Sequence, residues 1–97
     1  MMGGENMEQV DTIVLVDIQR ELEKPEPDLM NVYDKWTKDN FNNFALAVVR
    51  LKKDRYIFIP GKDIVFGGDK YIPEDIIIDN IKITRKGKNL LEKQGLL

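Results

Sequence analysis

The sequence predicts an α+β domain that is mainly α, with three helices, a β-hairpin and a C-terminal helix. Apolar residues repeat with helical spacing in the first half of the chain, runs of β-branched residues separated by Gly and Pro follow, and a capped helix comes last. Of the 97 residues, 42% are hydrophobic and 33% are charged, a balance typical of one folded domain. We expect a flexible N-terminus over residues 1–7 and a single domain over residues 8–97.

The first predicted helix covers residues 8–24. The β-branched residues at 12–16 would also suit a strand, but the helix formers that follow them favour a helix. Pro25 and Pro27 end this helix, because the residue before a proline avoids the helical region. Apolar residues recur every four positions along one face of the helix: Val10, Val14, Ile18 and Leu22.

A short second helix and a longer third helix are predicted next, with their junction near Thr37. Asp28 stands at the N-cap position of the second helix, and Thr37 can cap the third, which covers residues 38–53. Two helices joined by only a residue or two have the spacing of a helix-turn-helix. The buried face of the third helix follows helical periodicity: Phe41, Phe44, Ala45, Val48 and Leu51.

The second half of the chain predicts β structure. Residues 56–59 and 64–66 have the composition of strands, and Gly67-Gly68 suits a hairpin turn. Residues 76–83 are strand-like again, with Asp79-Asn80 either a bulge in one strand or a tight turn between two. Thr84 can cap the last helix, and Gly95 can stop it.

Two segments resemble winged-helix proteins. The segment LKKDRYI at 51–57 resembles the end of a recognition helix entering its first wing strand, and ITRKGKNLLE at 83–92 is similar to a signature that closes many small bacterial winged-helix domains. Over residues 8–94 the chain most resembles the small YjcQ-like proteins of bacteria and their phages. The resemblance implies a winged helix-turn-helix that binds DNA as a transcriptional regulator, or a protein-interaction module on the same scaffold. The stretch 60–83 is longer than a minimal wing.

Charge is distributed unevenly along the chain. Residues 1–34 carry nine acidic and two basic side chains, whereas residues 35–97 carry eight acidic and 13 basic ones, for a net charge of −2. A basic surface therefore has to come from the second part, where duplex DNA is the expected partner. The acidic first helix, or exposed apolar residues, would instead suit a protein partner. A homodimer would double the basic surface.

Helix 38–53 is the expected recognition helix, because the second helix of a helix-turn-helix enters the major groove. Asparagine is suited to read adenine and arginine to read guanine, while lysines contact phosphates. The asparagines would otherwise be ordinary polar surface residues. Arg85, Lys86 and Lys88 either attract an anion to the last helix or lie in solvent. The candidate DNA contacts are Lys38, Asn40, Asn42, Asn43, Arg50 and Lys53 on the helix, with Lys62 and Lys70 on the wing.

The residues that are missing exclude several classes of site. The chain has no cysteine and no histidine, which excludes disulfides, thiolate metal sites and histidine-dependent catalysis. No Gly-Lys-Ser/Thr follows Gly67-Gly68, so a nucleotide loop is not expected. We therefore expect neither enzymatic activity nor a cofactor or metal. No signal-peptide pattern and no apolar run of membrane-spanning length occur, so we expect a cytoplasmic protein with no membrane partner.

Overall fold

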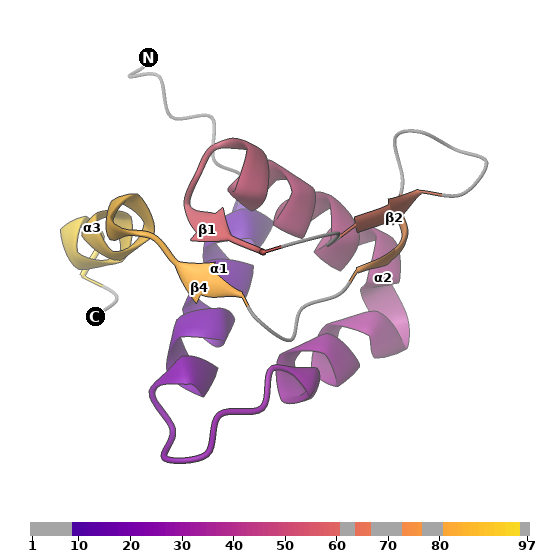
Figure 1. The fold of residues 1–97 in the computed structure, drawn as a ribbon, viewed down its shortest axis with the longest axis horizontal. Helices are drawn as coiled ribbons and strands as arrows, with labels where there is room; N and C mark the ends of the chain where they lie inside the picture. Colours follow the sequence, from indigo (N-terminus) through magenta and orange to yellow (C-terminus); the bar gives the residue numbers. More distant parts are fainter. Residues whose placement is uncertain (1–8, 61–63, 67–72, 77–80, 96–97) are drawn as a thin grey trace.

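The computed structural model describes residues 9–60, 64–66, 73–76 and 81–95, and it shows the mainly helical α+β architecture that was predicted (Figure 1). Two helices pack against each other, and short antiparallel strand pairs lead to a third helix. The elements in chain order are α1 (Gln9–Leu22), α2 (Met30–Lys53), β1 (Ile57–Phe58), β2 (Ile64–Phe66), β3 (Pro73–Ile76), β4 (Lys82–Ile83) and α3 (Arg85–Lys93).

Helix α1 confirms the first predicted helix and excludes the alternative of a strand at 12–16. Val14, Leu15 and Ile18 are at most 1% exposed and face α2, as their spacing predicts. The helix ends at Leu22, before Pro25. Among the described residues, no helix has the length and apolar character needed to cross a bilayer.

Helix α2 corrects the prediction of two separate helices joined near Thr37. The structure has one continuous helix from Met30 to Lys53. The Thr37 hydroxyl does not cap a new helix; it donates to the Tyr33 carbonyl one turn earlier, at 2.7 Å. Such a bond keeps the residue inside the helix and tends to bend it. The N-cap is Leu29, which makes no side-chain cap hydrogen bond, rather than the predicted Asp28. Asp28 instead supports the start of the helix from the preceding position, because its Oδ1 accepts from the Met30 backbone N–H at 3.0 Å.

Although continuous, α2 is strongly bent. In a straight helix the Cα atoms of Tyr33 and Phe44 would lie about 16 Å apart along the axis. Their ring centroids are only 6.1 Å apart, and those of Trp36 and Phe44 are 6.2 Å apart. The helix therefore turns between Trp36 and Phe44, as the change of direction in Figure 1 shows. The two segments that were predicted as separate helices are thus the two arms of one bent helix.

The strands form two antiparallel pairs. Ile57 of β1 lies opposite Ile83 of β4, and Ile64 of β2 lies opposite Ile76 of β3, with an irregularity in the register at Val65 and Phe66. Of the strand region predicted at 76–83, Ile76 ends β3 and residues 82–83 form β4. The choice between a bulge and a turn at Asp79-Asn80, and the hairpin turn at Gly67-Gly68, lie outside the described residues.

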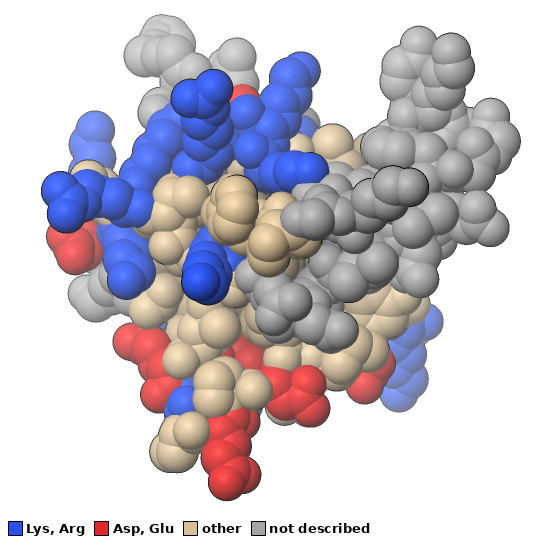
Figure 2. Space-filling model, viewed as in Figure 1, with Lys and Arg blue, Asp and Glu red and all other residues tan. Residues whose placement is uncertain are grey.

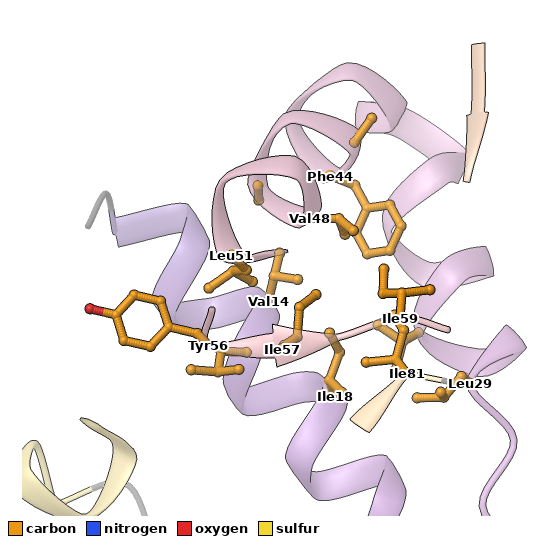
Figure 3. Packing of buried hydrophobic residues seen from close by; sticks show 14 of the residues in the cluster. Val14, Ile18, Leu29, Phe44, Val48, Leu51, Tyr56, Ile57, Ile59 and Ile81 are labelled. Carbon is orange, nitrogen blue, oxygen red and sulfur yellow. The ribbon is translucent and has the colours of Figure 1, made fainter. Parts of the chain in front are cut away.

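The hydrophobic core lies where α1, α2 and the β1–β4 pair meet (Figure 3). The predicted buried face of the third helix is confirmed for Phe44, Ala45, Val48 and Leu51, all at most 1% exposed, while Phe41 is partly buried against the core. The remaining buried hydrophobic residues among those described are Val14, Leu15, Ile18, Leu29, Val32, Ala47, Tyr56, Ile57, Ile59, Ile81 and Leu91.

Two acidic residues of α1 hold the first half of α2. Asp17 Oδ2 accepts from the indole Nε1 of Trp36 at 2.8 Å and from Lys35 Nζ at 2.9 Å. Glu21, which is 4% exposed, accepts from Asn31 and from the backbone N–H of Asp28. These carboxylates are therefore part of the contact between helices. The exposed acidic residues near this end include Glu23, Glu26, Asp28 and Asp34.

Hydrogen bonds also set the ionisation of Glu21. The bond from Lys24 Nζ, at 2.9 Å, and the bond from the Asp28 backbone both favour the carboxylate and lower the pKa of Glu21 below its ordinary value. The charged form of Glu21 is thus the one that stabilises the fold.

Candidate functional site

The C-terminus of α2 ends in a tight turn that projects Arg55 into solvent. Arg55 N–H donates to the Lys52 carbonyl at 3.0 Å, and Tyr56 N–H donates to the Leu51 carbonyl at 2.9 Å, the pattern of a Schellman motif. The motif requires a left-handed residue, and Arg55 has φ +66°. Glycine usually occupies this position, because a side chain there costs about 1 kcal/mol.

Helix α3 begins directly on this turn. The Thr84 hydroxyl lies 2.6 Å from the Arg55 carbonyl and 3.0 Å from the Tyr56 carbonyl, and it accepts from the Gly87 N–H at 3.1 Å. The predicted cap at Thr84 is therefore confirmed, and it also fixes the start of α3 to the end of α2. Gly95, with φ +71°, ends the helix as predicted.

Gly87 allows the close approach of these two segments. A Cβ atom at this position would lie 2.3 Å from the backbone oxygen of Tyr56 and 2.8 Å from Cγ2 of Ile83. Lys86 makes a further contact, because its Nζ donates to the Asp54 carbonyl at 2.8 Å and lies 4.4 Å from the centre of the Tyr56 ring. The first turn of α3 is thus packed against the end of α2.

This packing unites two basic segments that are about 30 residues apart in the sequence. We define the basic face as residues 52–55 together with residues 82–93, which hold eight cations and two carboxylates. Lys and Arg side chains gather over α3 and the adjacent end of α2, while Asp and Glu gather at the opposite end (Figure 2). Its cations are Lys52, Lys53, Arg55, Lys82, Arg85, Lys86, Lys88 and Lys93, all exposed except Lys52, which is half-buried.

An open pocket of about 440 Å³ lies within the basic face, between Tyr56 and α3. Tyr56 is 2% exposed and belongs to the hydrophobic core cluster. Its hydroxyl is buried without a hydrogen-bond partner, and its ring points away from the labelled core residues (Figure 3). The pocket is lined by Tyr56, Arg85, Lys86, Asn89, Leu90 and Lys93.

Four predicted DNA contacts lie exposed on α2. Lys53 belongs to the basic face, whereas Lys38, Asn42 and Asn43 lie further back along the helix. Asn42 and Lys53 are eleven residues apart, so they share one side of a regular helix. The side chain of Asn40 and the whole of Lys62 and Lys70 lie outside the described residues.

Arg50 has an intramolecular partner. Its Nε and Nη2 contact the Asp11 carboxylate at 2.9 and 2.8 Å, and the Asp11 side chain is only 3% exposed while that of Arg50 is 34% exposed. This bidentate ion pair joins α1 to the second half of α2. Sequence reasoning had placed Arg50 at a DNA base, because spacing alone does not show that Asp11 faces it.

The described residues show no cluster of three or more acidic side chains arranged to hold a metal ion. Comparison with known proteins found no matching family model, no matching curated protein and no matching solved structure. The site is therefore interpreted from its own chemistry.

Proposed function

We propose that the protein binds duplex DNA through the basic face, with a regulatory role. The observation that carries this proposal is the docking of α3 on the end of α2, which collects eight cations against two carboxylates. Such an excess of positive charge on one surface is what phosphate recognition requires, because each contacted phosphate releases counterions.

The second half of α2 supports the proposal with a solvent-accessible stripe that leads into this face. Asn42, Leu46, Val49 and Lys53 follow helical spacing, and the structure leaves each of them exposed or half-buried. Asparagine can donate to and accept from an adenine edge, while Lys53 and its basic neighbours contact phosphates. In this arrangement the basic face positions the protein and the stripe reads the sequence.

The polarity of the molecule is consistent with a fixed orientation on DNA. The acidic end, where α1 leads into α2, lies opposite the basic face (Figure 2). Phosphate repels the first surface and attracts the second, so only one side of the molecule can approach a duplex closely.

The test is fluorescence anisotropy with a labelled, mixed-sequence 20-base-pair duplex over a range of salt concentrations. We expect affinity to fall steeply with salt, and the double variant Lys53→Gln, Lys88→Gln to bind more weakly with a logarithmic salt slope reduced by about 2. Arg20→Gln is the control for loss of positive charge, because it removes an exposed cation of α1 that lies outside the basic face. Wild-type protein that fails to bind at low salt would refute the proposal.

A protein-interaction module is the second candidate, and exposed apolar residues favour it. Ile13 on α1 is 44% exposed and lines a pocket with Val16, Arg20 and Gln94, and Phe58 on β1 is 55% exposed. The carboxylates of Asp11, Asp17 and Glu21 on α1 already bond to residues of α2. The exposed apolar residues therefore suit a protein interface better than the acidic helix does. Sedimentation velocity of wild-type and Ile13→Glu protein tests whether the partner is a second copy.

A further inference from the structure

We propose that the pocket between Tyr56 and α3 binds a terminal phosphate, the phosphomonoester at the end of a nucleic-acid strand or on a free nucleotide. The inference rests on the proposed function, to which it adds one specific phosphate within the basic face. It is carried by the pocket's charge and by the buried, unpartnered Tyr56 hydroxyl.

The charge of the pocket suits a dianion. Of the six described residues that line it, three are cations, Arg85, Lys86 and Lys93, and none is a carboxylate. A phosphomonoester carries about −1.5 to −2 at neutral pH, whereas an internal phosphodiester carries −1. The positions of Arg85, Asn89 and Lys93 at i, i+4 and i+8 place their side chains along one side of α3.

The Tyr56 hydroxyl supplies a second, independent argument. A buried polar atom without a partner is unfavourable and uncommon in folded proteins. Among the described residues this hydroxyl has no partner, and it belongs to a residue that lines the pocket. The hydroxyl is closed to solvent in the unligated structure, so a phosphate oxygen would accept a hydrogen bond from it only after a local movement. The exposed Lys86 side chain, whose ammonium lies 4.4 Å from the ring centre, would move to meet the same phosphate.

The chemistry of the pocket favours a strand end over an internal position. An internal phosphate is bonded to a sugar on each side, whereas a terminal phosphate offers three free oxygens to the donors of the pocket. A terminal phosphate projects from its sugar and can approach Tyr56. The volume of about 440 Å³ lies in the range of small-molecule sites, which leaves room for the adjoining nucleoside.

The experiment compares one duplex sequence with 5′-phosphates or with 5′-hydroxyls, by anisotropy, together with thermal melting in adenosine monophosphate or adenosine. We expect the wild type to bind the phosphorylated duplex about tenfold more tightly, the ratio that one hydrogen bond to a charged group supplies. Tyr56→Phe and Lys93→Gln should lose this preference. Lys88→Gln changes a residue on the same helix but outside the pocket. It should lower the affinity for both duplexes and leave the preference for the phosphorylated duplex unchanged.

The folding of the key variant is controlled by its own melting curve. Tyr56→Phe removes an unpartnered hydroxyl, so its unligated melting temperature should equal or exceed that of the wild type. If Tyr56→Phe keeps or raises the melting temperature but loses the preference for the phosphorylated duplex, the Tyr56 hydroxyl binds the phosphate and does not serve only to stabilise the fold.

The outcomes distinguish the pocket from the wider proposal. Equal affinity for the two duplexes, with salt-dependent binding and no nucleotide-induced rise in melting temperature, overturns the pocket and leaves the basic face as the DNA site. A rise with adenosine monophosphate but not adenosine, absent in Tyr56→Phe, supports the pocket even if no duplex binds. A rise in melting temperature with adenosine monophosphate in a protein that binds no duplex would overturn the proposed function and identify the free nucleotide as the source of the phosphate.

Discussion

Replacing Gly87 by alanine sets two physical effects against each other. Glycine inside a helix is about 1 kcal/mol less favourable than alanine, so helix propensity alone predicts a more stable protein. The added Cβ, however, would lie 2.3 Å from the Tyr56 carbonyl oxygen, and this backbone atom cannot rotate away as a side chain can. Contact geometry therefore predicts a less stable protein.

The size of the effect follows from the displacement required. Moving the Cβ from 2.3 Å to an acceptable 3.0 Å shifts α3 by at least 0.7 Å. That shift strains a packed contact, at about 1–3 kcal/mol, and weakens the Thr84 cap, at about 1 kcal/mol. After the gain in helix propensity, we expect a net loss of about 1–3 kcal/mol in the free energy of unfolding and a fall in melting temperature of at least about 4 °C.

Urea and thermal denaturation followed by circular dichroism measure this loss. Gly95→Ala is the matched control, because Gly95 has φ +71° but nothing within 4 Å of an added Cβ. It should lose about 1 kcal/mol from backbone strain alone. A Gly87→Ala protein as stable as the wild type, or more stable, would show that α3 does not dock on Tyr56 as described.

Three further predictions concern residues at the helix contacts and the basic face. Arg50→Ala should lower the free energy of unfolding by about 3 kcal/mol in urea titrations, because it leaves the buried Asp11 carboxylate unpaired. The double variant Arg50→Ala, Asp11→Ala should recover part of this loss, and no recovery would contradict the role of the ion pair. Arg55→Gly should keep or raise the melting temperature, because φ is +66°, yet weaken duplex binding in anisotropy titrations, and unchanged affinity would remove Arg55 from the interface. Glu21→Gln should lower the free energy of unfolding in urea titrations at neutral pH. Because the pKa of Glu21 is lowered in the folded state, the difference in stability between wild type and variant should vanish as the pH falls through that pKa. A difference in stability that does not change with pH would contradict this role of the carboxylate.

Local periodicity was sufficient to predict much of the secondary structure. The four-residue repeat of α1, the buried face ending at Leu51 and the cap at Thr84 depend on neighbours within one or two helical turns. Such signals are readable from the sequence because a helix places residues three and four apart on the same side.

The junction at Thr37 was predicted wrongly because the same residue serves two local structures. A threonine can cap a new helix or bond back to the carbonyl four residues earlier, and the sequence does not choose between them. The packing of Phe44 against Tyr33 and Trp36 requires the chain to turn there, and a bend within α2 meets that requirement. Tertiary contact therefore decided the form of the turn.

The sequence by itself determined that any basic surface had to come from the second part of the chain and that thiolate or histidine chemistry was excluded. Only the tertiary structure decided which charged side chains lie on the surface, where a partner can bind them, and which are used in contacts between helices. It paired Arg50 with Asp11, turned Asp17 and Glu21 toward α2, and brought the residues around Arg55 against the start of α3. These contacts join residues of different elements that lie 10 to 39 positions apart in the sequence, and periodicity within one element carries no information about such partners.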